Sequence, residues 1–120
     1  MMLGPIGQIS MRALDIERAT AFYRDTLGVK HLFRAGTLSF FDCGGVRVML
    51  SIPEGDFDHP GSVLYFKVDD IQATHATLVS RGVQIVGEPH VIAKMPDHEL
   101  WMSFFRDSEG NTLALMEERR

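Results

Sequence analysis

The side chains of this chain that could do chemistry are few: five histidines, one cysteine and a scattering of carboxylates. Imidazole, thiolate and carboxylate groups bind metals and transfer protons near neutral pH. His90, His98 and Glu99 flank the segment 93–99 and could form a metal or acid–base site, although the spacing of the two histidines matches no established motif. Two other interpretations stay open. The segment is a plain surface loop that leads into a strand, or a lid whose His98 or Trp101 contacts a ligand.

The remaining candidates favour structural roles. His75 falls on an apolar helical stripe, which predicts a packed, hydrogen-bonded imidazole. His59 lies in a segment rich in Pro, Gly and Asp, where we expect it to face solvent, and His31 has no motif around it. Cys43 has no base near it in the sequence, which favours a buried structural thiol. The chain contains no G-x-S-x-G nucleophile motif, P-loop or dinucleotide fingerprint.

Length and charge exclude several classes of protein. The 120 residues suffice for one domain, with 45% hydrophobic and 23% charged residues, as in ordinary globular proteins. A net charge of −4 argues against a nucleic-acid partner. No apolar run approaches the roughly 20 residues that span a bilayer, and the first residues do not resemble a signal peptide. A single cysteine excludes an internal disulfide and fits a reducing compartment. We therefore expect a cytoplasmic protein.

Periodicity predicts the elements that must position these groups. Alternation predicts a strand over Ile6–Ala13, and Asp15 is typical of a helix N-cap. Apolar residues at helical spacing follow, and Gly28 marks the helix end. Three strands are then expected at about 29–34, 38–43 and 46–52, before a linker at 53–61.

The same order then restarts. A strand is predicted at 62–68, a cap at Asp69 or Asp70, and a helix that ends at Gly82. Further strands are predicted at 83–92, 100–106 and 112–116, with a loop at 93–99.

A repeated turn supports two copies of one unit. Asp42–Leu50 and Asp107–Leu115 share the pattern D-x-x-G-x-x-x-x-L, and each follows a pair of phenylalanines. The second copy carries Gly110-Asn111 between two apolar runs, which is typical of a hairpin. A four-stranded sheet with one helix leaves a face uncovered, so two copies should pair. The sequence predicts an α+β fold of two tandem βαβββ modules, about 6–52 and 62–118, within one domain spanning residues 1–120.

Two motifs resemble those of the glyoxalase/bleomycin-resistance/extradiol-dioxygenase (vicinal oxygen chelate) superfamily. Asp15, Ala19, Phe22, Tyr23, Leu27 and Gly28 match its D-x-x-x-A-x-x-F-Y-x-x-x-L-G motif, and Asp107–Asn111 resembles its D-P-D-G-N turn, with Ser108 and Glu109 in place of the usual residues. The resemblance implies that the two modules form a cupped, partly closed mixed sheet with the helices on the outside. It also implies a divalent metal held by up to four inward side chains.

The internal repeat locates these four positions in this chain. They are Gln8, Met49, Val63 and Ala114. Family enzymes place His, Gln or Glu there, because hard or borderline cations need nitrogen or oxygen donors. Only Gln8 could ligate, and shifting each position by one or two residues brings in no histidine or carboxylate. The resemblance therefore implies the fold without the metal site, and we expect no cofactor.

Alternation from these positions predicts the lining of the cup. It includes Ser10, Arg12, Ser51 and Thr112, and the resemblance adds Met102 and Phe104. The residues predicted to contact a ligand are Gln8, Arg47, Met49, Tyr65, Lys67, His98, Trp101, Met102, Phe104 and Met116. Arg47 and Lys67 would be its cationic groups, and a small, partly aromatic or anionic molecule would fit. The alternative is that these residues pack against one another.

The leading functional hypothesis is metal-independent binding of a small organic molecule, with no catalytic residue identified. The first alternative is a divergent metal-dependent glyoxalase- or dioxygenase-like enzyme that uses Gln8 and the loop histidines. The second alternative is an interaction module without a ligand. Exposed sheet edges and the resemblance favour a homodimer.

Overall fold

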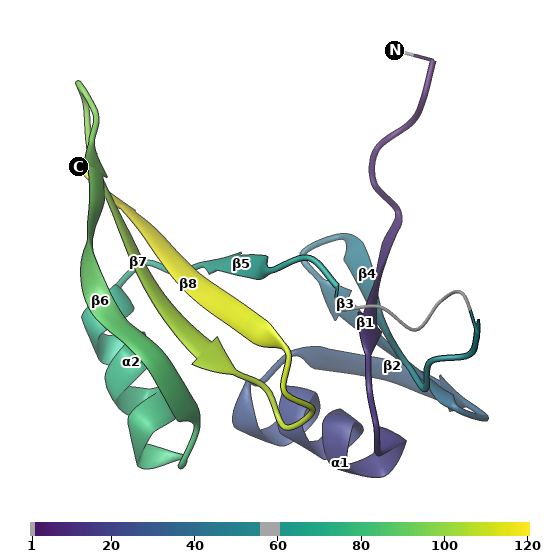
Figure 1. Cartoon of the computed structure of the whole chain (residues 1–120). Coiled ribbons are helices and arrows are strands. Elements are labelled where there is room, and N and C mark those ends of the chain that lie inside the picture. The colour runs from purple at the N-terminus through teal and green to yellow at the C-terminus, as the bar shows by residue number, and fades with distance from the viewer. Residues whose placement is uncertain (1, 56–60) are drawn as a thin grey trace. The chain divides into compact units, whose positions relative to one another are not determined.

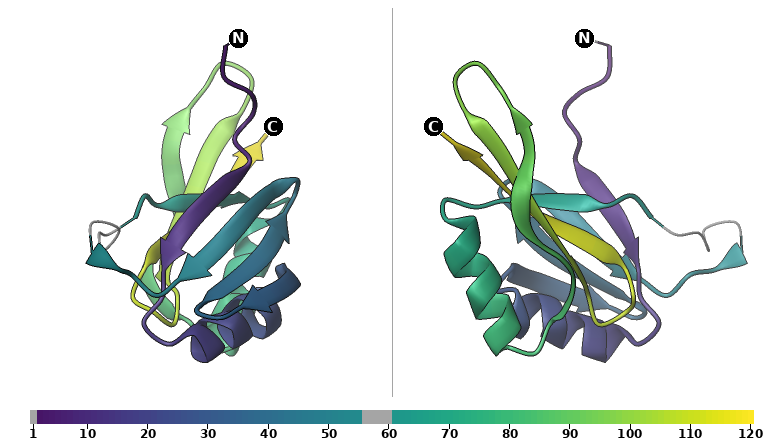
Figure 2. Two further views of the ribbon diagram at one scale, coloured as in Figure 1. Left: turned by 90° about the vertical axis from the view of Figure 1, so that its right-hand side faces the viewer. Right: turned by 60° about the vertical axis from the view of Figure 1, so that its left-hand side comes forward.

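Each half of the chain repeats the same order of elements. The computed structural model describes residues 2–55 and 61–120. The chain divides into two units, Met1–Gly61 and Ser62–Arg120, and in each of them one helical segment packs on a four-stranded sheet (Figures 1 and 2). Most of the predicted linker, including His59, lies outside the described residues. The prediction of an α+β fold built from two tandem βαβββ modules is confirmed.

The first module places its first strand beside its last. Its elements are β1 (Gln8–Arg12), α1 (Ile16–Ala21), the π-helical η1 (Phe22–Thr26), β2 (Lys30–Ala35), β3 (Leu38–Cys43) and β4 (Val46–Ser51). The sheet order is β1-β4-β3-β2. Strand β1 runs parallel to β4, and the other neighbours are antiparallel, so the sheet is mixed.

The second module has the same topology. Its elements are β5 (Leu64–Lys67), α2 (Ile71–Ser80), β6 (Gln84–Lys94), β7 (Glu99–Arg106) and β8 (Thr112–Arg119). The order β5-β8-β7-β6 repeats that of the first module, with β5 parallel to β8. Because the topologies agree, residues of the two modules can be compared position by position.

Both helices begin at the predicted aspartates. The Asp15 carboxylate accepts a hydrogen bond from the backbone N of Arg18 at 3.1 Å. In the second module Asp70, rather than Asp69, accepts from the N of Ala73 at 3.1 Å. Each carboxylate satisfies an N–H group that has no partner inside the helix.

The end of the first helix differs from a simple helix. After Ala21 the chain widens into η1, and the backbone N of Leu27 donates to the carbonyl of Phe22 at 2.9 Å. Gly28, at φ +74°, then reverses the chain, and the N of Val29 donates to the carbonyl of Tyr23. The predicted glycine is at the helix end because a left-handed residue is required there.

The repeated turn is organised by its aspartate in both modules. Oδ1 of Asp107 accepts from the backbone N of Glu109 at 2.9 Å and of Asn111 at 2.8 Å. In the first module Oδ1 of Asp42 accepts from the N of Gly45 at 3.1 Å. The predicted β7–β8 hairpin is therefore confirmed, and its carboxylate takes the place of backbone acceptors in the turn.

The predicted loop over 93–99 is wrong in extent. Strands β6 and β7 continue into this segment from both sides and leave only a tight turn, in which the N of Met95 donates to the carbonyl of His98 at 2.8 Å. The physical reason is Pro96-Asp97, a pair that suits the centre of a β-turn, because proline presets φ there. The segment is thus the tip of a long hairpin.

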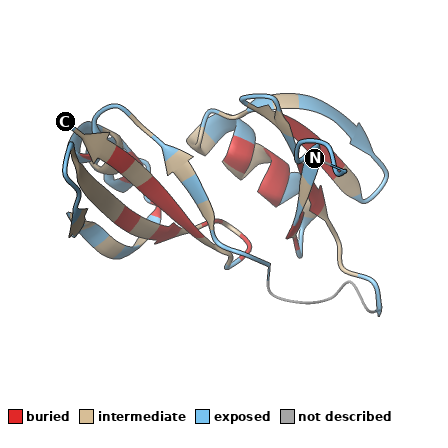
Figure 3. Ribbon diagram, turned by 90° about the horizontal axis from the view of Figure 1, so that it is seen from above, coloured by how far each residue is buried: buried red, intermediate tan, exposed pale blue. Residues whose placement is uncertain are grey.

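Each module buries one face of its sheet against its own helix. In the first module Phe41 and Leu50 are fully buried, and the Phe41 ring stacks on Tyr23 from η1 at 5.7 Å between centroids. In the second module Phe105 and Leu113 are buried on the sheet that α2 contacts. Figure 3 shows buried residues concentrated on α1 and along the central strands. Burial of these apolar faces is the main stabilising term.

A polar cluster lies inside the first core. The Thr20 hydroxyl donates its one proton to the Ile16 carbonyl at 2.6 Å, and its oxygen lies 2.9 Å from the Ser39 hydroxyl, which can donate to it. Nε2 of His31 lies 3.2 Å from the same Ser39 oxygen. Ser39 is fully buried, so these contacts satisfy a hydroxyl that water cannot reach.

The equivalent serine of the second module has no such partner. Ser39 lies opposite Leu50, and Ser103 lies opposite Leu115 in the matching strand pair. The buried Ser103 hydroxyl makes no hydrogen bond among the residues that the structure describes. His75, which occupies the α2 position matching Thr20, is half-buried but makes no hydrogen bond within the described segments, so its predicted polar contact is not found.

Replacing Ser103 by alanine is expected to leave stability unchanged or raise it by about 1 kcal/mol, because an unsatisfied buried hydroxyl is removed. The matched substitution Ser39→Ala should instead lower stability by about 1–2 kcal/mol, because it breaks bonds to Thr20 and His31. Urea unfolding of both variants measures the difference. Equal losses in the two variants would contradict the comparison.

Candidate functional site

Each sheet has a second face, which points away from its helix and which we call the open face. In the first module Ser39 bonds to α1 through Thr20, so its strand neighbour Phe40 points to the open face. Phe40 lies opposite Met49 in the antiparallel pair, and Met49 lies opposite Ser10 in the parallel pair. Gln8, Arg47 and Ser51 share this face by the same alternation. The first-module residues predicted to line a cup thus lie together on one face.

Gln8, Arg47 and Met49 are in contact. Nε of Arg47 donates to Oε1 of Gln8 at 2.7 Å, and Nε2 of Gln8 lies 3.7 Å from the sulfur of Met49. The Arg47 guanidinium also lies over the Phe40 ring, with Cζ 5.1 Å from its centroid. The Gln8 amide is therefore occupied on both sides, by a fixed cation and by a thioether.

These contacts do not fit the divalent metal that the fold implies. The one suitable donor of the first module, Oε1 of Gln8, already accepts a hydrogen bond from a guanidinium, whose positive charge would repel an incoming cation. Met49 offers only a soft thioether. In the second module Val63 and Ala114 have no donor atoms. Within residues 2–55 and 61–120, no three His, Cys, Asp or Glu side chains gather into a group that could hold a metal.

The open face of the second sheet is mainly apolar and aromatic. Met102 lies opposite Met116, and Lys67 is the parallel neighbour of Met116 on the other side. The Tyr65 ring meets the Phe104 ring edge to face, with centroids 6.2 Å apart. Strand alternation places these five residues on one face, where Met102, Met116, Tyr65 and Phe104 present thioether and aromatic groups.

Trp101 lies on the opposite face from Met102 and Phe104. It pairs with Glu117, whose Oε1 accepts a hydrogen bond from the backbone N of Ile71 at the start of α2. The indole N–H donates to Glu99 at 3.2 Å, and the Arg119 guanidinium stacks on the ring at 4.1 Å. Trp101 thus belongs to the helix side of the sheet, and we remove it from the proposed ligand contacts.

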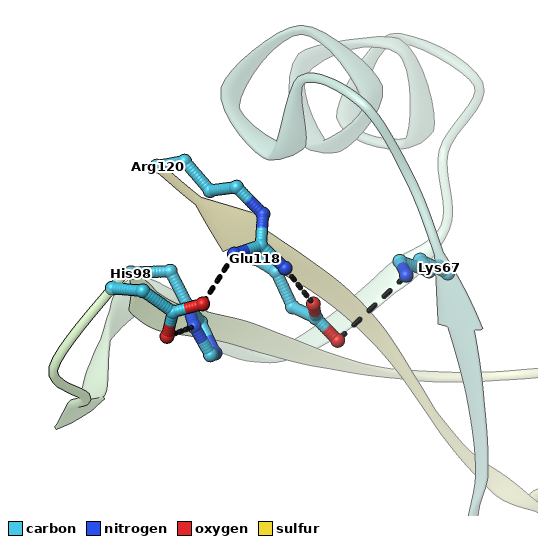
Figure 4. A network of polar contacts seen from close by, with 5 residues as sticks. Lys67, His98, Glu118 and Arg120 are labelled. Carbon is cyan, nitrogen blue, oxygen red and sulfur yellow. Dashed lines mark hydrogen bonds and ion pairs between the residues drawn. The ribbon is translucent and has the colours of Figure 1, made fainter.

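His98 and Lys67 are joined by a network at one end of the second sheet (Figure 4). Nδ1 of His98 lies 2.8 Å from Asp97, whose other oxygen accepts from Arg120 at 2.6 Å. Arg120 donates to Glu118 at 3.3 Å, and Glu118 lies 3.7 Å from the Lys67 ammonium. The His98 contact, followed by that of Arg120, lowers the pKa of Asp97. Lys67 is therefore already paired, which weakens it as a cationic ligand contact.

The other candidate groups are not brought into one site. Nδ1 of His90 lies 2.7 Å from the Glu88 carbonyl, beside its own strand. Burial, and then the neighbouring Asp42, raises the pKa of the Cys43 thiol, so thiolate chemistry is disfavoured. His31 is part of the Ser39 cluster under α1. No helix in the described parts of the chain is long and apolar enough to cross a membrane.

Comparisons with known proteins identify the family of this chain. The sequence profile of the Glyoxalase/Bleomycin resistance protein/Dioxygenase superfamily matches residues 5–115. A "Glyoxylase-like domain-containing protein" from Didymella fabae is 32% identical, in an alignment that covers 93% of this chain and 92% of the relative. The chain belongs to the glyoxalase/bleomycin resistance protein/dioxygenase superfamily, and the resemblance found in the sequence is confirmed.

Solved structures show the same fold. A superfamily member from Sphaerobacter thermophilus DSM 20745 has a TM-score of 0.81 at 26% identity, covering 98% of this chain and all of that chain (100%). Lactoylglutathione lyase from Agrobacterium tumefaciens has a TM-score of 0.76 at 23% identity, covering 96% of this chain and 94% of that chain. The second likeness concerns the fold alone, since fold does not fix chemistry.

Proposed function

We propose that this protein binds small organic molecules on the open face of each sheet, without a divalent metal. The observation that carries the proposal is the Arg47–Gln8 contact of 2.7 Å, which puts a fixed guanidinium at the one family metal position that retains a donor. The proposed ligand contacts are Gln8, Arg47, Met49, Tyr65, Lys67, Met102, Phe104 and Met116, with His98 at the edge. Their apolar and aromatic character suits an organic ligand better than a hydrated ion.

Chelator-treated protein provides the test. Adding Zn²⁺, Mn²⁺ or Ni²⁺ is expected to change its melting temperature by less than about 1 °C, because no donor set holds the ion. A panel of small aromatic acids, amines and neutral drug-like compounds should contain a ligand that raises it by several degrees. A ligand at 100 times its Kd adds about 2.7 kcal/mol. That rise should be the same with and without EDTA.

Two outcomes would overturn the proposal. A rise of several degrees with one metal would show a metal site. If that rise disappears in the double variant His90→Ala/His98→Ala, the metal-dependent glyoxalase- or dioxygenase-like enzyme is the better account. If no compound of the panel binds, the ligand-free interaction module is favoured.

The same proposal includes a homodimer in the cytoplasm, built from one domain per chain. Leu32 on the edge strand β2 is 42% exposed, which leaves apolar surface at the edge of the first sheet. The single cysteine suits a reducing compartment. Light scattering after gel filtration should give about twice the 13.5 kDa chain mass, and a monomer would contradict the dimer.

A further inference from the structure

Arg47 is fixed along its side chain but free at its end. Its Nε donates to Gln8, and its Cζ lies over the Phe40 ring. It makes no other polar contact within residues 2–55 and 61–120, so its two terminal amino groups keep their N–H donors. The side chain is exposed. A guanidinium that is oriented in advance loses less entropy when it binds a carboxylate through two parallel hydrogen bonds.

The face around Arg47 is cationic although the whole chain is acidic. Strand alternation places Lys30 and Arg47 on it, and among the described strand residues of this sheet Asp42 is the one carboxylate on the same face. Asp42 lies opposite Arg47 in the register, but its Oδ1 accepts from the backbone N of Gly45 in the turn. The chain as a whole carries a net charge of −4. An anion is therefore attracted to this face in particular.

An aromatic surface adjoins the guanidinium. The rings of Phe33 and Phe40 stack with centroids 4.5 Å apart and planes 23° apart. Phe40 is 8% exposed, whereas Phe33 is 47% exposed, so one ring of the pair is available to a partner. The Phe40 ring lies between Phe33 and the Arg47 guanidinium in these contacts. A flat ligand can thus meet an aromatic ring and a cation on the same face.

We propose that the open face of the first module binds a small aromatic carboxylate. The terminal amino groups of Arg47 take the carboxylate, and the ring of the ligand lies against Phe33. One guanidinium neutralises one carboxylate charge in a planar, two-bonded pair, which favours a carboxylate over a phosphate monoester. This inference narrows the ligand class of the proposed function and therefore rests on it.

Titration of the whole protein with benzoate, phenylacetate and naphthoate tests the inference. Benzamide and phenyl phosphate serve as neutral and doubly charged comparisons, and amide chemical shifts locate the contact. Binding of at least one carboxylate should move the signals of Phe33, Phe40 and Arg47, and benzamide should bind at least 10-fold more weakly. Arg47→Gln should lower the affinity for the carboxylate about 10- to 100-fold, because a charge-assisted pair is lost.

Three further variants make the result specific. Arg47→Lys keeps the charge but loses the planar fork, so it should also bind at least several-fold more weakly. Phe33→Leu should weaken binding by removing the ring contact. Arg24→Gln is the matched control, because Arg24 lies on η1, where it pairs with Asp25 at 2.8 Å. The affinity of this variant for the carboxylate should equal that of the unmodified protein.

Several results would overturn the inference. If the carboxylates bind with equal affinity to the Arg47→Gln and Arg24→Gln proteins, the site lies elsewhere. If phenyl phosphate binds through the same residues more tightly than the carboxylates do, the proposed ligand class is wrong. If no carboxylate binds while another compound of the wider panel does, this inference fails and the proposed function stands. If nothing in either panel binds, both fail.

Discussion

Replacing Phe41 by alanine is expected to lower the free energy of unfolding by about 4 kcal/mol. Phe41 is fully buried. Its ring stacks on the Tyr23 ring with centroids 5.7 Å apart, and the centroid of the His31 ring lies 4.9 Å away. Removing a buried phenyl ring loses its transfer free energy and leaves a cavity that the neighbours fill only in part. Urea unfolding at neutral pH measures the change.

Phe33 provides a matched control on the other face of the same sheet. It is 47% exposed, so Phe33→Ala should cost only about 1 kcal/mol, mainly for the stacking on Phe40. The two substitutions should separate stability from binding. Phe41→Ala should mainly lower stability, whereas Phe33→Ala should mainly lower the affinity for an aromatic carboxylate. A loss for Phe33→Ala as large as that for Phe41→Ala would contradict the assignment of the two faces.

Replacing Glu117 by alanine is expected to lower the free energy of unfolding by about 3 kcal/mol. The residue is 6% exposed, and its carboxylate accepts hydrogen bonds from the Ile71 backbone N and the Arg119 side chain, each at 2.8 Å. Removing it leaves an N–H group at the start of α2 unsatisfied and a guanidinium on Trp101 without its partner. Glu118→Ala is the matched control, because this neighbour is more exposed and should cost less than about 1 kcal/mol.

The Glu117 contribution should depend on pH. Hydrogen bonds from Arg119, and then from the Ile71 backbone, lower the pKa of this carboxyl in the folded protein. A lowered pKa means that the stabilisation is complete above the unfolded pKa, about 4.3, and is lost as the pH falls through the folded value. The stability difference between the unmodified protein and Glu117→Gln should therefore be larger at about pH 7 than at about pH 3. A difference that stays constant over this range would contradict the carboxylate contacts.

The sequence predicted those features that depend on local spacing. The caps at Asp15 and Asp70 and the turn at Asp107 follow from side chains that bond to backbone a few residues away. The shared face of Gln8 and Arg47 follows from the period of two in a strand.

Features that depend on pairing over long separations were missed. The Arg47–Gln8 contact joins residues 39 apart and depends on the parallel register of β1 and β4. Trp101 was expected to contact a ligand from a lid, and only the pairing of β7 with β8 places it beside Glu117 on the helix side of the sheet. Glu117 carries no sequence signal of burial, because only its contact with the start of α2 removes it from solvent.

Two local features were also missed although the sequence carried a signal. The turn at Pro96-Asp97 lies inside the predicted loop, because the polar residues around it give no sign of the strand pairing that continues to Lys94 and Glu99. The π-helical turn over Phe22–Thr26 has no compositional mark, and it places Tyr23 against Phe41.

The intact native mass of the gently purified protein, compared with its denatured mass, tests the central claim most directly. We expect a native dimer whose mass equals two 13.5 kDa chains, with or without an organic adduct, and no divalent metal in stoichiometric amount. The mass of any adduct would be the first clue to the ligand, and an aromatic carboxylate would agree with the Arg47 site. A mass increment of about one divalent ion per chain, retained through purification and removed by a chelator, would contradict the account.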